Sequence, residues 1–186
     1  GAGNFLGLQN GTLRYTGAGT NTTTRYLWID QAQTGSTFEI TQASGALVLA
    51  PNGGNRIYPI TKTGPGTLSM QGLLSGGASV TVAGGTLTLG AANTYSGFTT
   101  VSNGLLLVDG WSGTGTVTIE SGATLGGTGV VRGPVTQHGI LSPGAGIGTL
   151  SVSNTITAEA TSTTRIELGG TNELSDYDRL VASDVH

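Results

Sequence analysis

The sequence predicts an all-β fold, a single-stranded right-handed parallel β-helix (β-solenoid) with about 17–21 residues per coil. Three observations predict it. Of 186 residues, 34 are Gly and 31 are Thr, so residues that permit sharp turns are mixed with residues that favour strands. Short segments alternate apolar and hydroxyl side chains. Finally, a short glycine-led phrase recurs at a nearly constant spacing.

The predicted strands are short and have a period of two. Residues 80–82, 86–89 and 116–119 each alternate Thr with Val, Leu or Ile. This alternation is typical of a strand with one buried face and one wet face. Gly-Gly, Asn-Gly and Pro-Gly pairs separate the strands and indicate turns. Helical spacing is nowhere sustained.

The repeat begins with Gly-Thr-Leu or a close variant. Gly-Thr-Leu itself starts at Gly11, Gly66, Gly85 and Gly148. We place the unit starts at positions 45, 66, 85, 104, 122 and 139, and the spacing between them shortens gradually along the chain. The longer interval from 11 to 45 fits two coils, with Trp28-Ile29 or Phe38-Glu39-Ile40 as the strand between them.

Alternating strands joined by Asn-Gly or Gly-Gly can also form antiparallel hairpins, which would give a β-sandwich. We favour the solenoid because the units resemble each other and recur at one coil length. We expect one continuous domain over residues 1–186, with weakly matching coils in 1–59 and clear repeats in 60–182.

Composition excludes several classes of protein. With 36% hydrophobic and 9% charged residues, the chain is not a disordered one. A net charge of −3 and a single lysine, Lys62, predict no nucleic-acid partner. No apolar run is long enough to span a bilayer, so we expect no direct membrane insertion by this segment.

One stretch closely resembles a known family, the autotransporter-associated β-strand repeat of bacterial passenger domains. In that family a strand is followed by Asn-Thr-Tyr-(Ser/Thr)-Gly-Gly-Thr-Thr. The matching residues here are Asn93, Thr94, Tyr95, Ser96, Gly97, Thr99 and Thr100. Phe98 replaces the second glycine.

The flanking phrases resemble the same family. Residues 60–68 look like its Leu-Thr-Lys-Thr-Gly-x-Gly-Thr-Leu, with Lys62 and Gly66 in matching places. Residues 139–144 contain its Leu-Ser-Pro-Gly corner, which ends at Pro143 and Gly144. The acidic phrase at 167–180 resembles the end of such a module. The resemblance implies a parallel β-helix displayed outside the cell, and a structural role for the matching motif residues.

Few residues could support catalysis. Acid–base or glycosidic chemistry needs two carboxylates at a fixed separation. The only acidic residues in 1–118 are Asp30, Glu39 and Asp109, which are far apart in sequence. His138 and His186 are the only histidines. We therefore predict no enzyme, no catalytic residue and no cofactor, and a carbohydrate-active β-helix enzyme is the least favoured alternative.

Clustered carboxylates suit hard cations. Asp176 and Asp178 are the candidate metal ligands, with Glu173 and Asp184 nearby in sequence. The chain lacks the Gly-Gly-x-Gly-x-Asp repeat of calcium-binding β-rolls. A solvated acidic corner is therefore the interpretation we favour.

The predicted function is a non-catalytic stalk or adhesin segment, extracellular or on the bacterial cell surface. Its expected partners are adjacent coils of a parent chain or identical copies placed end to end. Because no capping helix is evident, a self-assembling filament of stacked coils is the alternative. A surface glycan is a further candidate partner if aromatic residues align on one outer face. Those residues are Tyr15, Tyr26, Trp28, Tyr58, Tyr95 and Trp111.

Overall fold

The computed structural model describes residues 5–8, 10–29, 35–51, 55–56, 59–172 and 175–186. These residues form strands and turns but no helix, so none of them could cross a membrane as a helix. All pairings between the named strands are parallel. The predicted parallel β-solenoid is confirmed. The β-sandwich alternative is wrong, because its hairpins would pair strands antiparallel.

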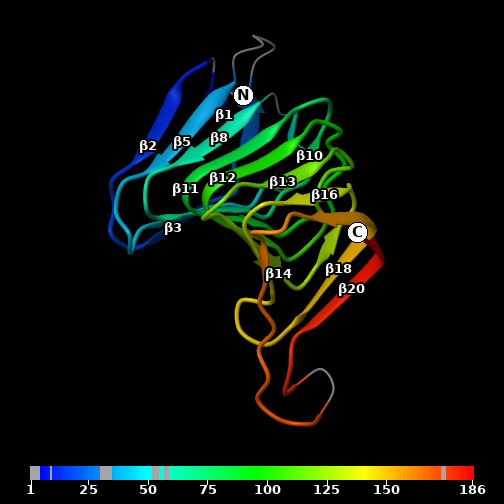
Figure 1. Ribbon diagram of the computed structural model, residues 1–186. Helices are drawn as coiled ribbons and strands as arrows, with labels where there is room; N and C mark the ends of the chain where they lie inside the picture. Colours follow the sequence, from blue (N-terminus) through cyan, green and yellow to red (C-terminus); the bar gives the residue numbers. More distant parts are fainter. Residues whose placement is uncertain (1–4, 9, 30–34, 52–54, 57–58, 173–174) are drawn as a thin grey trace.

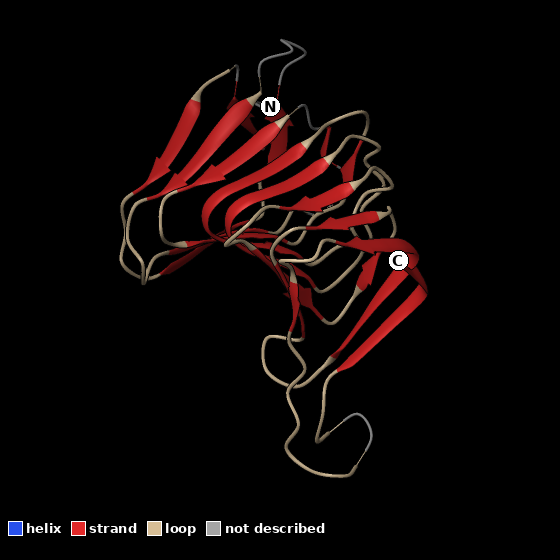
Figure 2. Cartoon of the chain, viewed as in Figure 1, coloured by secondary structure: helices blue, strands red, loops and turns tan. Residues whose placement is uncertain are grey.

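The coils stack so that their strands line three faces of the solenoid (Figures 1 and 2). The first face carries β2 (Thr12–Tyr15), β5 (Ser36–Ile40), β8 (Ile60–Thr63), the beginnings of β11 (Val80–Leu89) and β12 (Thr99–Val108), β13 (Val117–Ile119), β16 (Val135–Gln137) and the end of β18 (Thr149–Ala158). In Figure 1 these strands lie side by side from blue to yellow.

The second face carries β3 (Thr20–Thr23), β6 (Ala46–Leu49), β9 (Thr67–Met70), the ends of β11 and β12, β14 (Thr124–Gly127), β17 (Ile140–Pro143) and β19 (Thr163–Thr164). The third face carries β1 (Phe5–Leu8), β4 (Tyr26–Ile29), β7 (Asn55–Arg56), β10 (Leu74–Ser75), β15 (Val130–Val131) and the beginnings of β18 and β20 (Arg179–Val185), while the end of β20 continues the first face beside the end of β18. Single bridges from Ala92 to Trp111 and from Trp111 to Val130 continue this third face.

The register of the second face confirms the predicted unit starts. The residues that pair from coil to coil each come just after a predicted start, and they are Ala46, Thr67, Thr86, Leu105, Thr124 and Ile140. The phrase at Gly11 was wrongly counted two coils before this series, because its strand lies on the first face. The phrase at Gly148, which was not counted as a unit start, begins a strand of the third face. Thr12 pairs with Thr37 on the first face, and Thr149 pairs with Arg179. The separation of Thr12 from Thr37 shows that the first coil is also longer than predicted.

The core consists of stacked aliphatic columns. On the second face the inward column is Leu47, Leu68, Leu87, Leu106, Leu125 and Leu141. All six are buried, and the last five are fully inaccessible to solvent. Burying a leucine side chain stabilises a fold by about 1.5–3 kcal/mol. Because each leucine contacts its equivalents one coil away, this stabilisation is distributed along the whole stack.

Outward positions on the first face form an unbroken threonine column. Its members are Thr12, Thr37, Thr61, Thr81, Thr100, Thr118, Thr136 and Thr157. Branched side chains pack well against their neighbours on a pleated surface. The outside of this face therefore carries threonine methyl and hydroxyl groups rather than charges along this line.

Glycines allow the coils to approach closely at the corners. A Cβ atom at Gly115 would collide with the carbonyl oxygen of Gly97, and one at Gly133 would collide with that of Gly115. A column of glycines therefore leads into the first face. By contrast, a Cβ atom at Gly77 would meet nothing within 4 Å.

Candidate functional site

Asn93 ties three consecutive coils together. Its side chain is fully buried, and its Oδ1 accepts a hydrogen bond of 2.9 Å from the backbone N–H of Leu74. Its Nδ2 donates to the carbonyls of Ala91 at 3.1 Å and Trp111 at 2.8 Å. These groups lie where the third face has only single bridges. The Asn93 amide therefore hydrogen-bonds to backbone groups that a longer strand would have paired with the neighbouring coil.

Tyr95 fills the core beside Asn93. It is fully buried, and its hydroxyl lies 2.8 Å from Oγ1 of buried Thr99. Burial raises the pKa of this phenol. Its ring lies where a Cβ atom at Gly113 would fall, so the next coil needs a glycine there. Two of the motif residues therefore fill the interior rather than forming a surface site.

Ser96 and Gly97 of the same motif lie at the corner. Ser96 is exposed, and its N–H donates to the carbonyl of Gly76 at 2.8 Å. A Cβ atom at Gly97 would collide with the carbonyl of Ala78. The glycine therefore permits the chain to pass close to the preceding coil as it enters β12.

Lys62 occupies an inward position in β8, between Phe38 and Val82 of the neighbouring coils. It is 1% exposed, and its Nζ donates to the carbonyls of Thr63 at 2.8 Å, Gly64 at 2.8 Å and Gly84 at 3.0 Å. Desolvation lowers the pKa of this amine from 10.5 to about 8. No carboxylate among the described residues pairs with it, so the ammonium serves corner carbonyls alone.

Gly66, Pro143 and Gly144, which belong to the flanking phrases, form two corners. Gly66 is buried, and its N–H donates to the carbonyl of Ile40 at 3.1 Å. Pro143 is buried at the end of β17. Gly144 follows with a φ of 79°, and it exchanges backbone hydrogen bonds of 2.8 and 3.0 Å with Gly127. This antiparallel bridge folds the chain back over the second face.

The two candidate metal ligands bind backbone groups instead of facing each other. Asp178 is 4% exposed, and its two carboxylate oxygens accept hydrogen bonds of 2.9 Å from the N–H groups of Gly148 and Glu167. Asp176 is half-buried and accepts from Asn172 and Ser175, and the backbone hydrogen bond from Asn172 contributes most to lowering its pKa. Glu173 lies outside the described residues. Nowhere in the described chain do three or more His, Cys, Asp or Glu side chains gather as a metal site would require.

The other ionisable residues are scattered. Glu39 Oε2 accepts from Nε of Arg14 at 2.7 Å, on the outside of the first face. His138 is half-buried in a corner, and His186 lies 2.9 Å from Asp184 in the last strand. Asp30, which could have joined Glu39, lies outside the described residues.

The described aromatic side chains do not form a common platform. Tyr95 is buried, and the half-buried Tyr15 directs its hydroxyl to the carbonyl of Gly19. Tyr26 and Trp111 are both partly exposed on the third face, but β7 and β10 lie between them. The guanidinium of Arg132 lies 5.3 Å from the centre of the Trp111 ring. Tyr58 and the side chain of Trp28 lie outside what the structure describes.

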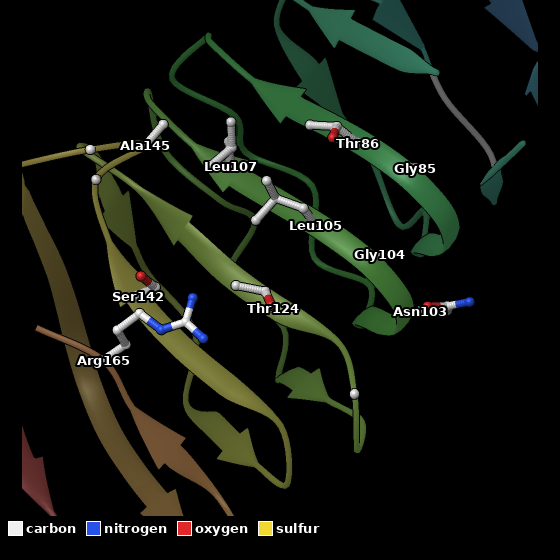
Figure 3. A pocket seen from close by; sticks show the side chains of 13 residues that line it. Gly85, Thr86, Asn103, Gly104, Leu105, Leu107, Thr124, Ser142, Ala145 and Arg165 are labelled. Atoms are coloured by element: carbon white, nitrogen blue, oxygen red, sulfur yellow. The ribbon is translucent and has the colours of Figure 1, made fainter. Parts of the chain in front are cut away.

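A groove of about 500 Å³ crosses the outside of the second face (Figure 3). Outward side chains of four consecutive coils line its base: Thr86, Leu105, Leu107, Thr124 and Ser142. The turn Gly144–Gly146 and Arg165 line one side, and Asn103 with corner glycines lines the other. Among the described residues that line the groove, Arg165 is the only ionisable one, and it is exposed.

Sequence reasoning missed this groove, although two signals for it are visible. Residues 105–107 are Leu-Leu-Leu, which breaks the alternation and puts two leucines on the outward side of β12. Gly126 then provides no side chain in the adjacent coil, where the turn 144–146 passes over it. The turn was expected as a corner, but its return over the second face depends on the Gly127–Gly144 bridge.

Comparisons with known proteins agree with the fold. The chain is 43% identical over 77 residues to the adhesin BmaC autotransporter of Brucella suis biovar 1 (strain 1330). It is a β-solenoid similar to autotransporter passengers. A second similarity, 44% identity over 81 residues, is to an extracellular serine protease of Serratia marcescens.

These similarities cover parts of each chain. They span 39% and 42% of this chain, but only 2% of the adhesin and 8% of the protease. No family model matches, and no solved structure matches.

Proposed function

We propose that this chain is a non-catalytic structural segment of a secreted or cell-surface bacterial protein, a stalk or adhesin segment built as a β-solenoid. The observation that carries the proposal is the use made of buried polar side chains. Asn93, Lys62 and Asp178 all bind backbone groups of neighbouring coils. Their polar groups are therefore engaged in hydrogen bonds that stabilise the stack of coils.

The groove supports the same proposal. Hydrolysis of a glycosidic bond ordinarily uses two carboxyl groups on either side of that bond. The described residues of the groove lining include no carboxyl group and no histidine, and the single ionisable side chain among them is a guanidinium. Such a surface can hold a ligand, but it provides neither a general acid nor a general base near neutral pH.

A location outside the cell is proposed from the names of the two similar proteins, one an autotransporter adhesin and the other an extracellular protease. The chain's architecture suits exposure to proteases, because its strands are paired with the coils above and below. Local opening of such a backbone requires breaking several ladder hydrogen bonds together.

The proposal is tested by two measurements on the purified chain. The first is digestion with subtilisin, compared between the native chain and the Asn93→Asp variant described in the Discussion. The second is chromatography of products after incubation with acidic and neutral polysaccharides and with casein. We expect slow digestion of the native chain and no turnover. Turnover that follows the protein through purification and is lost on unfolding would overturn the proposal.

A further inference from the structure

We infer that the groove on the second face binds a carboxylate-bearing sugar unit, such as a uronic acid in an acidic polysaccharide. This inference rests on the proposed function and gives the surface segment a ligand class. The groove's volume of about 500 Å³ lies within the range of small-ligand sites. It crosses the outward side chains of four consecutive coils, so a chain of sugars could continue beyond the bound unit.

The lining has the groups that a sugar would need. Thr86, Thr124 and Ser142 present hydroxyls, each of which can donate and accept hydrogen bonds. Leu105 and Leu107 present methyl groups between Thr86 and Thr124, and these methyl groups suit the C–H face of a sugar ring. Polar groups spaced around an apolar base are the usual composition of a small-molecule site.

Arg165 determines the charge of the ligand. Its side chain reaches toward the groove beside Ser142 in Figure 3, and its backbone N–H is anchored to the carbonyl of Leu141 at 2.8 Å. No carboxylate in the described chain pairs with its guanidinium, whereas Arg14 is paired with Glu39. An unpaired guanidinium can bind a carboxylate through two parallel hydrogen bonds. An anionic ligand therefore complements the site.

A peptide fits the groove less well. Extended peptides usually bind by adding a strand to an open sheet edge. Here β12 is already paired on both sides, with β11 and β14, and β14 is paired with β12 and β17. The base of the groove thus presents side chains and no free backbone ladder.

The test is a titration of the full chain with tetragalacturonate and, separately, with its methyl ester, by calorimetry. Three variants accompany the native chain. Arg165→Gln removes the exposed charge, and Thr124→Val removes one hydroxyl while keeping a branched strand residue. Arg25→Gln is the matched control, since Arg25 is an exposed arginine outside the groove.

We expect the acid to bind the native chain and the Arg25→Gln variant equally. Affinity should fall about tenfold or more in Arg165→Gln, because hydrogen bonds to charged groups are among the strongest. The methyl ester should bind weakly to all four proteins. Amide shifts of Gly104, Gly122 and Gly146 on titration would locate the ligand in the groove.

Equal affinity of the native chain and Arg165→Gln, equal affinity for acid and ester, or no binding at all would each overturn the inference. None of these outcomes would contradict the proposed structural role. Cleavage of the tetragalacturonate, detected by chromatography of the same samples, would instead contradict the proposed function.

Discussion

At the residue scale, the notable side chains of this protein are polar groups that the coil stack has enclosed. Asn93 satisfies an N–H from one coil and carbonyls from two others. Lys62 and Gln137 occupy the same inward column of the first face, and both donate to carbonyls at the following corner. In each case a side chain forms a hydrogen bond that the backbone of the turn does not itself make.

Replacing Asn93 tests its role as a donor. In Asn93→Asp, Oδ1 still accepts from Leu74, but the second oxygen faces the carbonyls of Ala91 and Trp111. We expect a loss of about 3 kcal/mol or more in the free energy of unfolding at neutral pH, measured by urea denaturation. The difference from the native chain should shrink at acidic pH, where a protonated Asp regains one donor. A pH-independent difference would contradict this account.

Lys62 should make stability depend on pH. Its pKa is about 8 in the folded chain against 10.5 for the ordinary amine. Between these values the unfolded chain holds a proton that the folded chain lacks, so stability rises as pH rises through this window. Below pH 8 both states are protonated, and the contribution stays at its lowest value. We expect a gain of about 2 kcal/mol from pH 8 to pH 10.

The matched variant is Lys62→Gln, which keeps an amide donor, as Gln137 does, but cannot titrate in this window. Urea denaturation of both proteins at pH 8, 9 and 10 should show the gain only in the native chain. Any contribution from Tyr95, whose raised pKa acts in the opposite direction above pH 10, is common to both proteins. Parallel pH profiles would show that Lys62 is not the cause.

At the scale of the elements, the corners determine how closely two coils approach. We expect Gly115→Ala to destabilise the chain by about 2 kcal/mol or more, because its Cβ would collide with the backbone of Gly97. Gly77→Ala is the control at another turn, and should be neutral or raise stability by about 0.4–1 kcal/mol. Thermal denaturation of the two variants compares them directly. Similar melting temperatures would argue against close approach at this corner.

The strands and their stacking could be predicted from the sequence, because one alternation and one glycine-led phrase recur coil after coil. The same phrase misled at Gly11, since it identifies a strand start but not which face the strand joins. The metal interpretation of Asp176 and Asp178 depended on their sequence proximity. Their hydrogen-bond partners, Asn172 and Gly148, are determined by how the last coils fold. A local sequence pattern carries no information about that fold.

At the scale of the whole molecule, each coil contacts mainly its neighbours, so stability is close to a sum of coil terms. Deleting residues 117–134 removes one register step, from Val117 to Val135. We expect this variant to remain folded, with a slope of urea denaturation reduced by about a tenth. Deleting only 117–125 removes half a coil and should abolish cooperative unfolding. Circular dichroism and urea titration distinguish the two, and loss of folding in both would argue against independent coils.

The parallel ladders also have a mechanical consequence. Backbone hydrogen bonds between coils lie along the axis of the stack, so tension applied along that axis loads successive coils in series. Each coil then bears the full force, and the weakest contact between neighbouring coils sets the rupture force. Asn93 hydrogen-bonds to three coils where the third face has only single bridges. Its side chain therefore reinforces the ladder where few backbone hydrogen bonds connect the coils. A segment pulled outward from a surface would therefore extend coil by coil, with its resistance concentrated at such ties.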